Sequence, residues 1–263
     1  ETGLVPADTD AGRDDRMLCT WQEIKEMHDS GVIDFQCHSY NHDLVFTSDN
    51  LVGFLNPAFV SPFFGKSDHP IVIQDGEQLT FTNLCCFRGQ TAAGHWGTPI
   101  YEHKPRMAAP QRYLSAPALR ERLTSFVRDN GDEAFFERAD WEKLLHDEVK
   151  QAGVTTRGET LRGKDYQAHV AQELERSVAA IEANLPGKTV QHLCPPWFVA
   201  QEAALQTAEE IGFRAAFLGV EQRAMAERPG AMHRVQRLAF KYVTRLPGSH
   251  RSSLLRTVLD RSG

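Results

Sequence analysis

Apolar and polar residues follow a helical period over several long stretches of the chain, and short apolar runs separate these stretches. The helical period predicts helices over residues 20–30, 115–129, 139–151, 164–185, 200–211 and 251–260. The short apolar runs predict strands over residues 32–37, 189–194, 213–218 and 234–239. Strands that alternate with helices are typical of parallel βα units, so the pattern predicts an α/β fold.

The first helix carries clear boundary signals. Thr20 and Glu23 form a T-x-x-E capping box, and Gly31 is placed to end the helix. Residues 43–113, in contrast, hold many aromatic residues, prolines and glycines without a helical period; residues 71–81 predict a β-hairpin around Asp75-Gly76. We interpret residues 1–263 as a single domain, with residues 43–160 as an insertion or lid within it.

Composition limits the classes of partner. The 263 residues carry a net charge of −6 without a long basic stretch, so nucleic acid and anionic membranes are poor candidates. No apolar run approaches the ~18 residues that span a bilayer. The oligomeric state stays open.

The cysteines point away from a disulfide framework or a structural zinc site. Their number is odd, and no C-x-x-C occurs among Cys19, Cys37, Cys85, Cys86 and Cys194. We expect reduced, mostly buried thiols, which favours the cytoplasm. Export remains open if a signal peptide lies upstream.

Two histidines, His38 and His42, directly follow the predicted strand 32–37. Ligands gather at the carboxyl ends of strands in α/β folds, and two neutral imidazoles at this spacing can bind one divalent cation. A chain with eleven histidines also contains such a pair by chance. The preceding strand, the intervening Ser39 and the polar Asn41 favour a metal site.

Residues 20–42, TWQEIKEMHDSGVIDFQCHSYNH, resemble the polysaccharide deacetylase family (carbohydrate esterase family 4). The order of capped helix, glycine, strand and H-[ST]-x-x-H is the same. Residues 193–197, LCPPW, and residues 212–217, GFRAAF, resemble the family's third motif and the unit that follows it.

The resemblance implies a distorted (β/α) barrel that removes acetyl groups from a polysaccharide or glycan precursor. In the family an aspartate and two histidines hold a divalent metal, usually zinc, and a second aspartate is the general base. His38 and His42 would be the metal ligands here, and Ser39 would support their loop. A non-catalytic carbohydrate-binding protein and another metal-dependent hydrolase, such as an amidase, are the alternatives.

The chain departs from the family at several motifs. The T-F-D-D-G motif is absent, and in the family it lies upstream of where this sequence starts without a methionine. We therefore expect a fragment or processed form whose barrel is N-terminally incomplete, with a gap beside residues 32–37. Asp14 and Asp15 are the only adjacent aspartates, and we expect neither to reach the histidines. The third motif also lacks its arginine.

Further candidates lie elsewhere in the chain. His250 is a candidate general acid, although residues 246–250 have one residue too many for the family's L-x-x-H, and His233 is its rival; both have the alternative of being solvated loop histidines. Trp197 would form an apolar wall for the substrate or a core aromatic. Trp96 and Tyr101, with His103, would bind the glycan from the insertion or pack as its cover.

Overall fold

The computed structural model describes residues 19–57, 71–75, 78–82, 95–153, 158–219 and 231–237. Its longer helices are α1 (Trp21–Asp29), α2 (Pro117–Asp129), α3 (Trp141–Ala152), α4 (Gly163–Asn184) and α5 (Glu202–Ile211), with short 3₁₀ turns at Arg106–Ala108, Asp132–Glu137 and Pro196–Phe198. Its strands are β1 (Asp43–Phe54), β2 (Ile71–Asp75), β3 (Gln78–Thr82), β4 (Pro99–Pro105), β5 (Arg112–Leu114), β6 (Glu159–Leu161), β7 (His192–Leu193), β8 (Ala215–Leu218) and β9 (His233–Gln236).

The helices agree with the sequence pattern. The Thr20 hydroxyl accepts a hydrogen bond from the Glu23 N–H, and the Glu23 carboxylate accepts one from the Thr20 N–H, so the capping box of α1 is confirmed. The predicted helix at residues 251–260 lies outside the described residues.

A small parallel sheet holds the end of the predicted first strand. Its order is β7-β8-β9, and Cys37 adds a parallel bridge to Leu193 at the β7 edge. The strand predicted over residues 32–37 is therefore reduced to Cys37. The Gln36 side chain accepts hydrogen bonds from the N–H groups of Gln191 and His192, where a longer strand would use its backbone.

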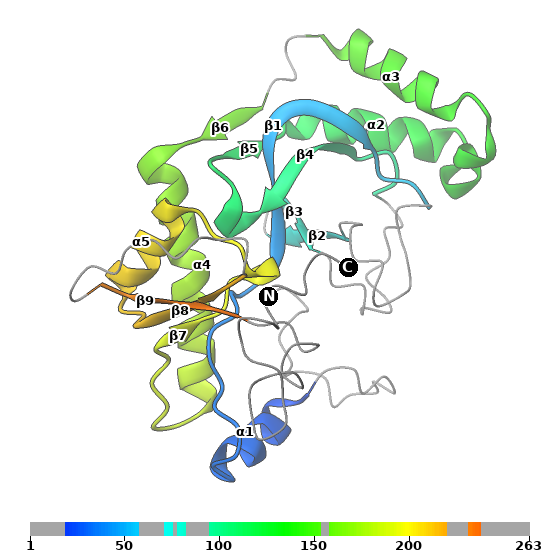
Figure 1. Cartoon of the computed structure of the whole chain (residues 1–263). Coiled ribbons are helices and arrows are strands. Elements are labelled where there is room, and N and C mark those ends of the chain that lie inside the picture. The colour runs from blue at the N-terminus through cyan, green and yellow to red at the C-terminus, as the bar shows by residue number, and fades with distance from the viewer. Residues whose placement is uncertain are drawn as a thin grey trace, which may run out of the picture.

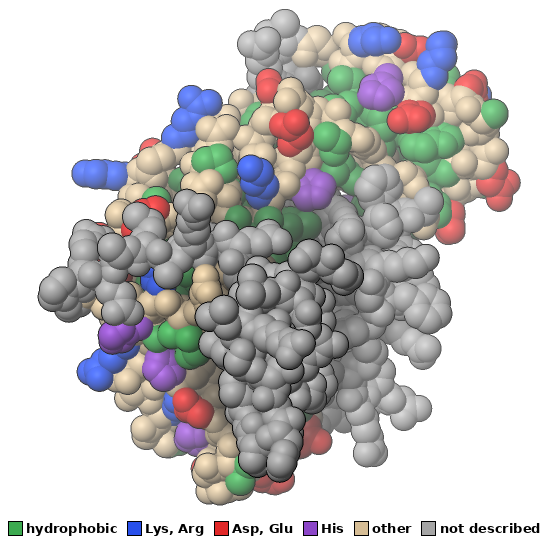
Figure 2. Space-filling view, in the orientation of Figure 1, with side chains coloured by type: hydrophobic (Ala, Val, Ile, Leu, Met, Phe, Trp, Pro, Cys, Tyr) green, Lys and Arg blue, Asp and Glu red, His purple; other side chains and the backbone are tan. Residues whose placement is uncertain are grey.

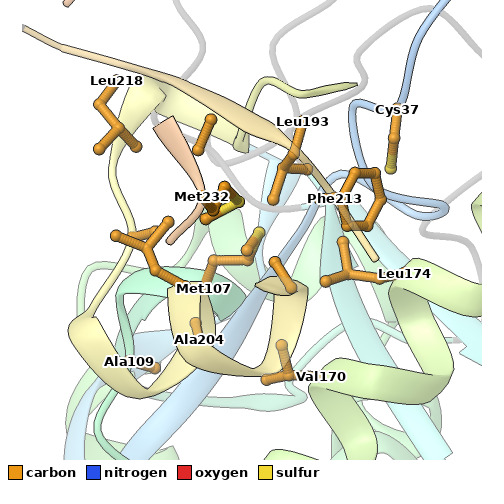
Figure 3. Close-up of a cluster of buried hydrophobic side chains, with 14 of the residues drawn as sticks. Cys37, Met107, Ala109, Val170, Leu174, Leu193, Ala204, Phe213, Leu218 and Met232 are labelled. Carbon is orange, nitrogen blue, oxygen red and sulfur yellow. The ribbon is translucent and has the colours of Figure 1, made fainter. Parts of the chain in front are cut away.

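Helices α4 and α5 pack on the parallel sheet. Figure 3 shows them on the same side of it, with Leu174, Leu193 and Phe213 in the core between helix and sheet. This arrangement confirms a mixed α/β fold. A closed barrel is not seen among the described residues, and the expected gap in a barrel stays a prediction.

An antiparallel sheet, of order β2-β3-β1-β4, occupies much of the predicted insertion. The hairpin of β2 and β3 is confirmed, since Asp75 pairs with Gln78 across the predicted turn. Strand β1 was not predicted. Its first half is buried on both faces, so the run lacks the alternation that identifies a half-exposed strand.

Strand β1 lies between two hydrophobic clusters. Val45 belongs to the cluster under the parallel sheet, which we call the first core, whereas Leu44 and Phe46 belong to the second core, formed with α2 and α3. Figure 1 shows β1 (blue) running from beside the parallel sheet to α2 and α3. Because β1 begins directly after His42, it anchors the histidine segment to both cores.

On the face seen in Figure 2, acidic and basic side chains are interspersed around α2 and α3. None of the described helices is both long and apolar enough to cross a membrane.

Candidate functional site

The candidate site lies at the carboxyl edge of the parallel sheet. His38 follows Cys37, the segment Cys194–Phe198 follows β7, Gly219 follows β8, and Arg237 follows β9. Parallel strands bring their carboxyl ends to one edge, which is where α/β folds place their ligands. The sheet topology therefore gathers residues that are up to 199 positions apart in the sequence, from His38 to Arg237.

The two predicted metal ligands lie side by side. The ring centroids of His38 and His42 are 4.9 Å apart with an angle of 52° between the ring planes. The His42 ring in turn lies 4.4 Å from the Trp197 ring, at 45°. The structure thus brings together the three residues that the sequence analysis assigned to metal and substrate at this edge.

A backbone hydrogen bond orients His38. Its Nδ1 lies 2.5 Å from the carbonyl oxygen of Cys194, which can only accept, so Nδ1 carries the proton. In the neutral ring the lone pair is then on Nε2. Metal-binding histidines commonly have this arrangement, with one ring nitrogen bonded to a carbonyl and the other free for the ion.

The surroundings of His38 favour the neutral form of its ring. Desolvation lowers the pKa of His38, the Cys194 carbonyl opposes this, and the positive charge of Arg237 lowers the pKa further. The side chain is exposed, yet neighbouring atoms still displace enough water for desolvation to be the largest effect. A neutral imidazole is the form that binds a metal.

The backbone around the site is strained. Ser39, His42, Trp197 and Phe198 all have positive φ, at 69°, 50°, 54° and 62°. Such conformations are rare in residues other than glycine and gather at functional sites. The Ser39 hydroxyl accepts a hydrogen bond from the His42 N–H at 3.1 Å, which supports the turn between the two histidines.

Arg237 and Phe198 complete the edge, and the sequence analysis missed both. The Arg237 guanidinium lies 4.2 Å above the Phe198 ring centre, and its Nη1 is 3.5 Å from the Cys194 sulfur. The Phe198 carbonyl accepts a hydrogen bond from the Gly219 N–H at 2.7 Å. Neither residue belongs to a motif, and Arg237 was predicted inside the strand 234–239, whereas β9 ends at Gln236, so no sequence signal marked it.

Three buried charged side chains, Asp43, Arg106 and Glu173, lie beside the histidine segment. Asp43 forms a bidentate ion pair with Arg106, with Nε donating to Oδ1 at 2.9 Å, and both side chains are buried. Glu173 of α4 is buried nearby. Burial raises the pKa of Glu173, as does the charge of Asp43, while Arg106 and the backbone N–H groups that bond Glu173 act in the opposite direction.

Other predicted residues come from the second core, from β4 or from the amino end of β9. Trp96 and Tyr101 are only 8% and 4% exposed in the second core, and His103 bonds the Tyr101 carbonyl. Packing explains Trp96 and Tyr101, and their burial gives the glycan-binding prediction no support. His233 begins β9 and so lies at its opposite, amino end.

Other predicted residues lie outside the ranges that the structure describes, namely Asp14, Asp15, His250 and the Cys85-Cys86 pair. Of the cysteines that the structure describes, Cys19, Cys37 and Cys194 are free; Cys37 is buried as expected, whereas Cys194 is half-buried and Cys19 is exposed.

The histidines fit a metal only in part. Their rings, their spacing and the orientation of His38 suit a zinc site, which takes imidazole nitrogens readily. Within the described ranges, however, no group of three or more His, Cys, Asp or Glu side chains converges on one point. A third protein ligand would have to come from elsewhere.

Comparisons with known proteins give two similar solved structures. No protein-family model matches the chain, and no curated protein matches it. A de-N-acetylase from Aggregatibacter actinomycetemcomitans is 14% identical with a TM-score of 0.41, covering 86% of this chain and 52% of its own. The BpsB deacetylase domain from Bordetella bronchiseptica is 16% identical with a TM-score of 0.41, covering 83% and 48%.

Both solved structures are deacetylases, the class of enzyme named by the sequence resemblance. This chain spans about half the length of each. At this TM-score the likeness carries no argument about activity, so the function is argued from the chain's own residues.

Proposed function

We propose that this chain is a deacetylase-like hydrolase that removes N-acetyl groups from a polysaccharide or glycan precursor with the help of a divalent metal, zinc. One observation carries the proposal: His38 and His42 lie ring beside ring at the carboxyl edge of the parallel sheet, with His38 Nδ1 bonded to a carbonyl. This agrees with the H-[ST]-x-x-H motif of the family that the sequence resembles.

A bound zinc ion would polarise the acetyl carbonyl and lower the pKa of a water molecule. His38 and His42 would hold it through one nitrogen each. No third His, Cys, Asp or Glu side chain joins the two histidines within the described ranges, so we place the third ligand and the general base among residues outside them. Asp14 and Asp15 stay weak candidates for these roles, and His250 stays the candidate acid.

Trp197 is the residue that we propose to contact the substrate. Its ring lies beside His42, is partly exposed and packs against the second core. An aromatic ring at this place would contact a sugar face or the methyl of the acetyl group. Trp197 therefore takes the role that the sequence analysis shared among Trp197, Trp96 and Tyr101.

The test measures metal binding and acetate release separately. Zn²⁺ is titrated into the chain and into the variants His38→Ala and His42→Ala, with exposed His233→Ala as the matched control. We expect each site variant to lose at least tenfold in zinc affinity and the control to bind as the wild type does. Equal zinc binding by all four proteins would refute the metal site.

Acetate release from an N-acetylated polysaccharide is then assayed with zinc present. Release that depends on His38 and His42 supports the hydrolase. The different-class alternative is a non-catalytic carbohydrate-binding protein, which is favoured by the lack of a third donor within the described ranges. Glycan binding without acetate release in the presence of zinc would favour that alternative.

A further inference from the structure

We propose that Glu173 of α4 is a positioning residue for the metal-binding segment, fixing where His42 lies relative to His38. The inference rests on the proposed function, because it assigns a role within the same site. Glu173 is far from the histidines in the sequence and belongs to none of the motifs that the family resemblance uses.

The contacts of Glu173 are with the residues between the two histidines. One carboxylate oxygen accepts hydrogen bonds from the N–H groups of Tyr40, at 3.0 Å, and Asn41, at 2.5 Å. The other accepts one from the Asn41 side-chain amide at 3.1 Å. A charged acceptor with three donors gives stronger hydrogen bonds than a neutral one. Glu173 therefore fixes two successive peptide units between His38 and His42.

Ser177, one helical turn after Glu173, holds the same segment. Its hydroxyl donates to the Ser39 carbonyl oxygen at 3.2 Å and accepts from the Cys37 thiol at 3.3 Å. Residues four apart lie on one helix face, so a single face of α4 bonds Cys37, Ser39, Tyr40 and Asn41. The hydrogen bonds from this face go to the Cys37 thiol, the Ser39 carbonyl and residues 40–41, the segment that joins the two histidines.

The hydrogen bonds to Glu173 stabilise a strained backbone turn. The segment holds Ser39 and His42 at positive φ, conformations that persist only when their surroundings determine them. Glu173 is only 5% exposed, and burying a carboxylate costs free energy unless donors compensate. Here the donors come from the segment itself, so the carboxylate and the strained turn stabilise each other.

The experiment compares Glu173→Ala and Glu173→Gln with Glu175→Ala, an exposed glutamate on the same helix. Co²⁺ is the probe, because its visible absorption reports both affinity and ligand geometry. Hydrogen exchange of the peptide covering residues 37–43, measured without metal, reports the segment on its own. Thermal unfolding confirms that each variant is folded.

We expect Glu173→Ala to weaken Co²⁺ binding by 10- to 100-fold, to alter the absorption spectrum and to speed exchange at Tyr40 and Asn41. Glu173→Gln keeps an acceptor in place and should lose less than Glu173→Ala, in the same direction. Glu175→Ala should match the wild type. If Glu173→Ala fails to fold, Glu173→Gln decides the question.

Wild-type Co²⁺ affinity and spectrum in the folded Glu173 variants would overturn the inference while leaving the proposed metal site intact. This holds even if their exchange is faster, since the segment would then be supported without positioning the ligands. A wild-type chain that binds no Co²⁺ would overturn the proposed function, and the ligand-positioning role with it.

Discussion

At the scale of single residues, the site depends on how His38 is oriented and kept neutral. The Cys194 carbonyl fixes the proton on Nδ1, and Arg237 and desolvation disfavour a second proton. Both effects arise from residues that follow β7 and β9, so they exist only once the parallel sheet has formed. His42 depends on Ser39 and Trp197 instead. The segment that follows β7 thus contacts both rings, His38 through Cys194 and His42 through Trp197.

The pKa of His38 offers a direct check. We expect His38 to titrate below the usual value of 6.5, and Arg237→Gln to raise its pKa, since removing a nearby positive charge favours the imidazolium. A proton competes with a metal, so Zn²⁺ affinity should fall as pH decreases toward the His38 pKa, and at a higher pH in the variant. NMR titration of the histidine ring signals measures both. Arg214→Gln, at an exposed arginine, is the control, and an unchanged His38 pKa in Arg237→Gln would contradict the assignment.

At the scale of elements, the helices could be predicted and β1 could not. Periodic apolar positions and the capping box defined α1 to α5 to within a few residues, because these signals are local. Strand β1 packs Val45 into one core and Leu44 and Phe46 into the other, so its burial depends on long-range neighbours. The strand predicted over residues 32–37 was wrong because its apolar side chains find no buried neighbours: Val32 is 84% exposed and Ile33 41%. At Gln36 the side chain, in place of the backbone, accepts the hydrogen bond from the His192 N–H.

In the candidate site, too, some residues could be predicted from local sequence signals and others depend on long-range contacts. His38, His42 and Trp197 were identified from a motif and from strand ends. Glu173 and Ser177 had a signal that went unused, since they interrupt the buried face that Tyr166, Val170 and Leu174 form on α4. Arg237 had none, because a guanidinium stacked on Phe198 depends on the register of β9 beside β8.

The start of β1 supplies a stability prediction. Asp43 directly follows His42 and pairs with Arg106, and both are buried. Replacing Arg106 by Met leaves a buried carboxylate without its partner, which should cost about 3–5 kcal/mol in the free energy of unfolding. Arg122→Met breaks a more exposed ion pair with Glu148 and should cost about 1 kcal/mol or less. Urea unfolding measures both, and equal costs would mean that burial does not determine the value of the Asp43–Arg106 pair.

At the scale of the whole molecule, the two cores have separate tasks. The first core joins α4 and α5 to the parallel sheet and holds the histidine segment through Cys37. The second core joins the antiparallel sheet to α2 and α3 and contacts the site through Trp197. Whether residues 43–160 form an insertion in a larger barrel stays a prediction. Within the described residues this region contributes its own sheet and core.

The separation into two cores predicts which core mutations weaken metal binding. Leu123 on α2 and Leu174 on α4 are both fully buried, one in each core. Truncating either to Ala should lower the free energy of unfolding by about 2–5 kcal/mol, from lost burial and the cavity left behind.

Leu174 adjoins Glu173 in the helix that holds the histidine segment, so Leu174→Ala should also weaken Co²⁺ binding under conditions where the variant is fully folded. Leu123→Ala should bind Co²⁺ as the wild type does, because the second core is joined to the site through Trp197, which is not a ligand, and through β1, whose start is also held by the first core at Val45. Urea unfolding and Co²⁺ titration of the two variants, side by side, make the comparison. A loss of Co²⁺ affinity in folded Leu123→Ala as large as in Leu174→Ala would show that the second core shapes the metal site as much as the first.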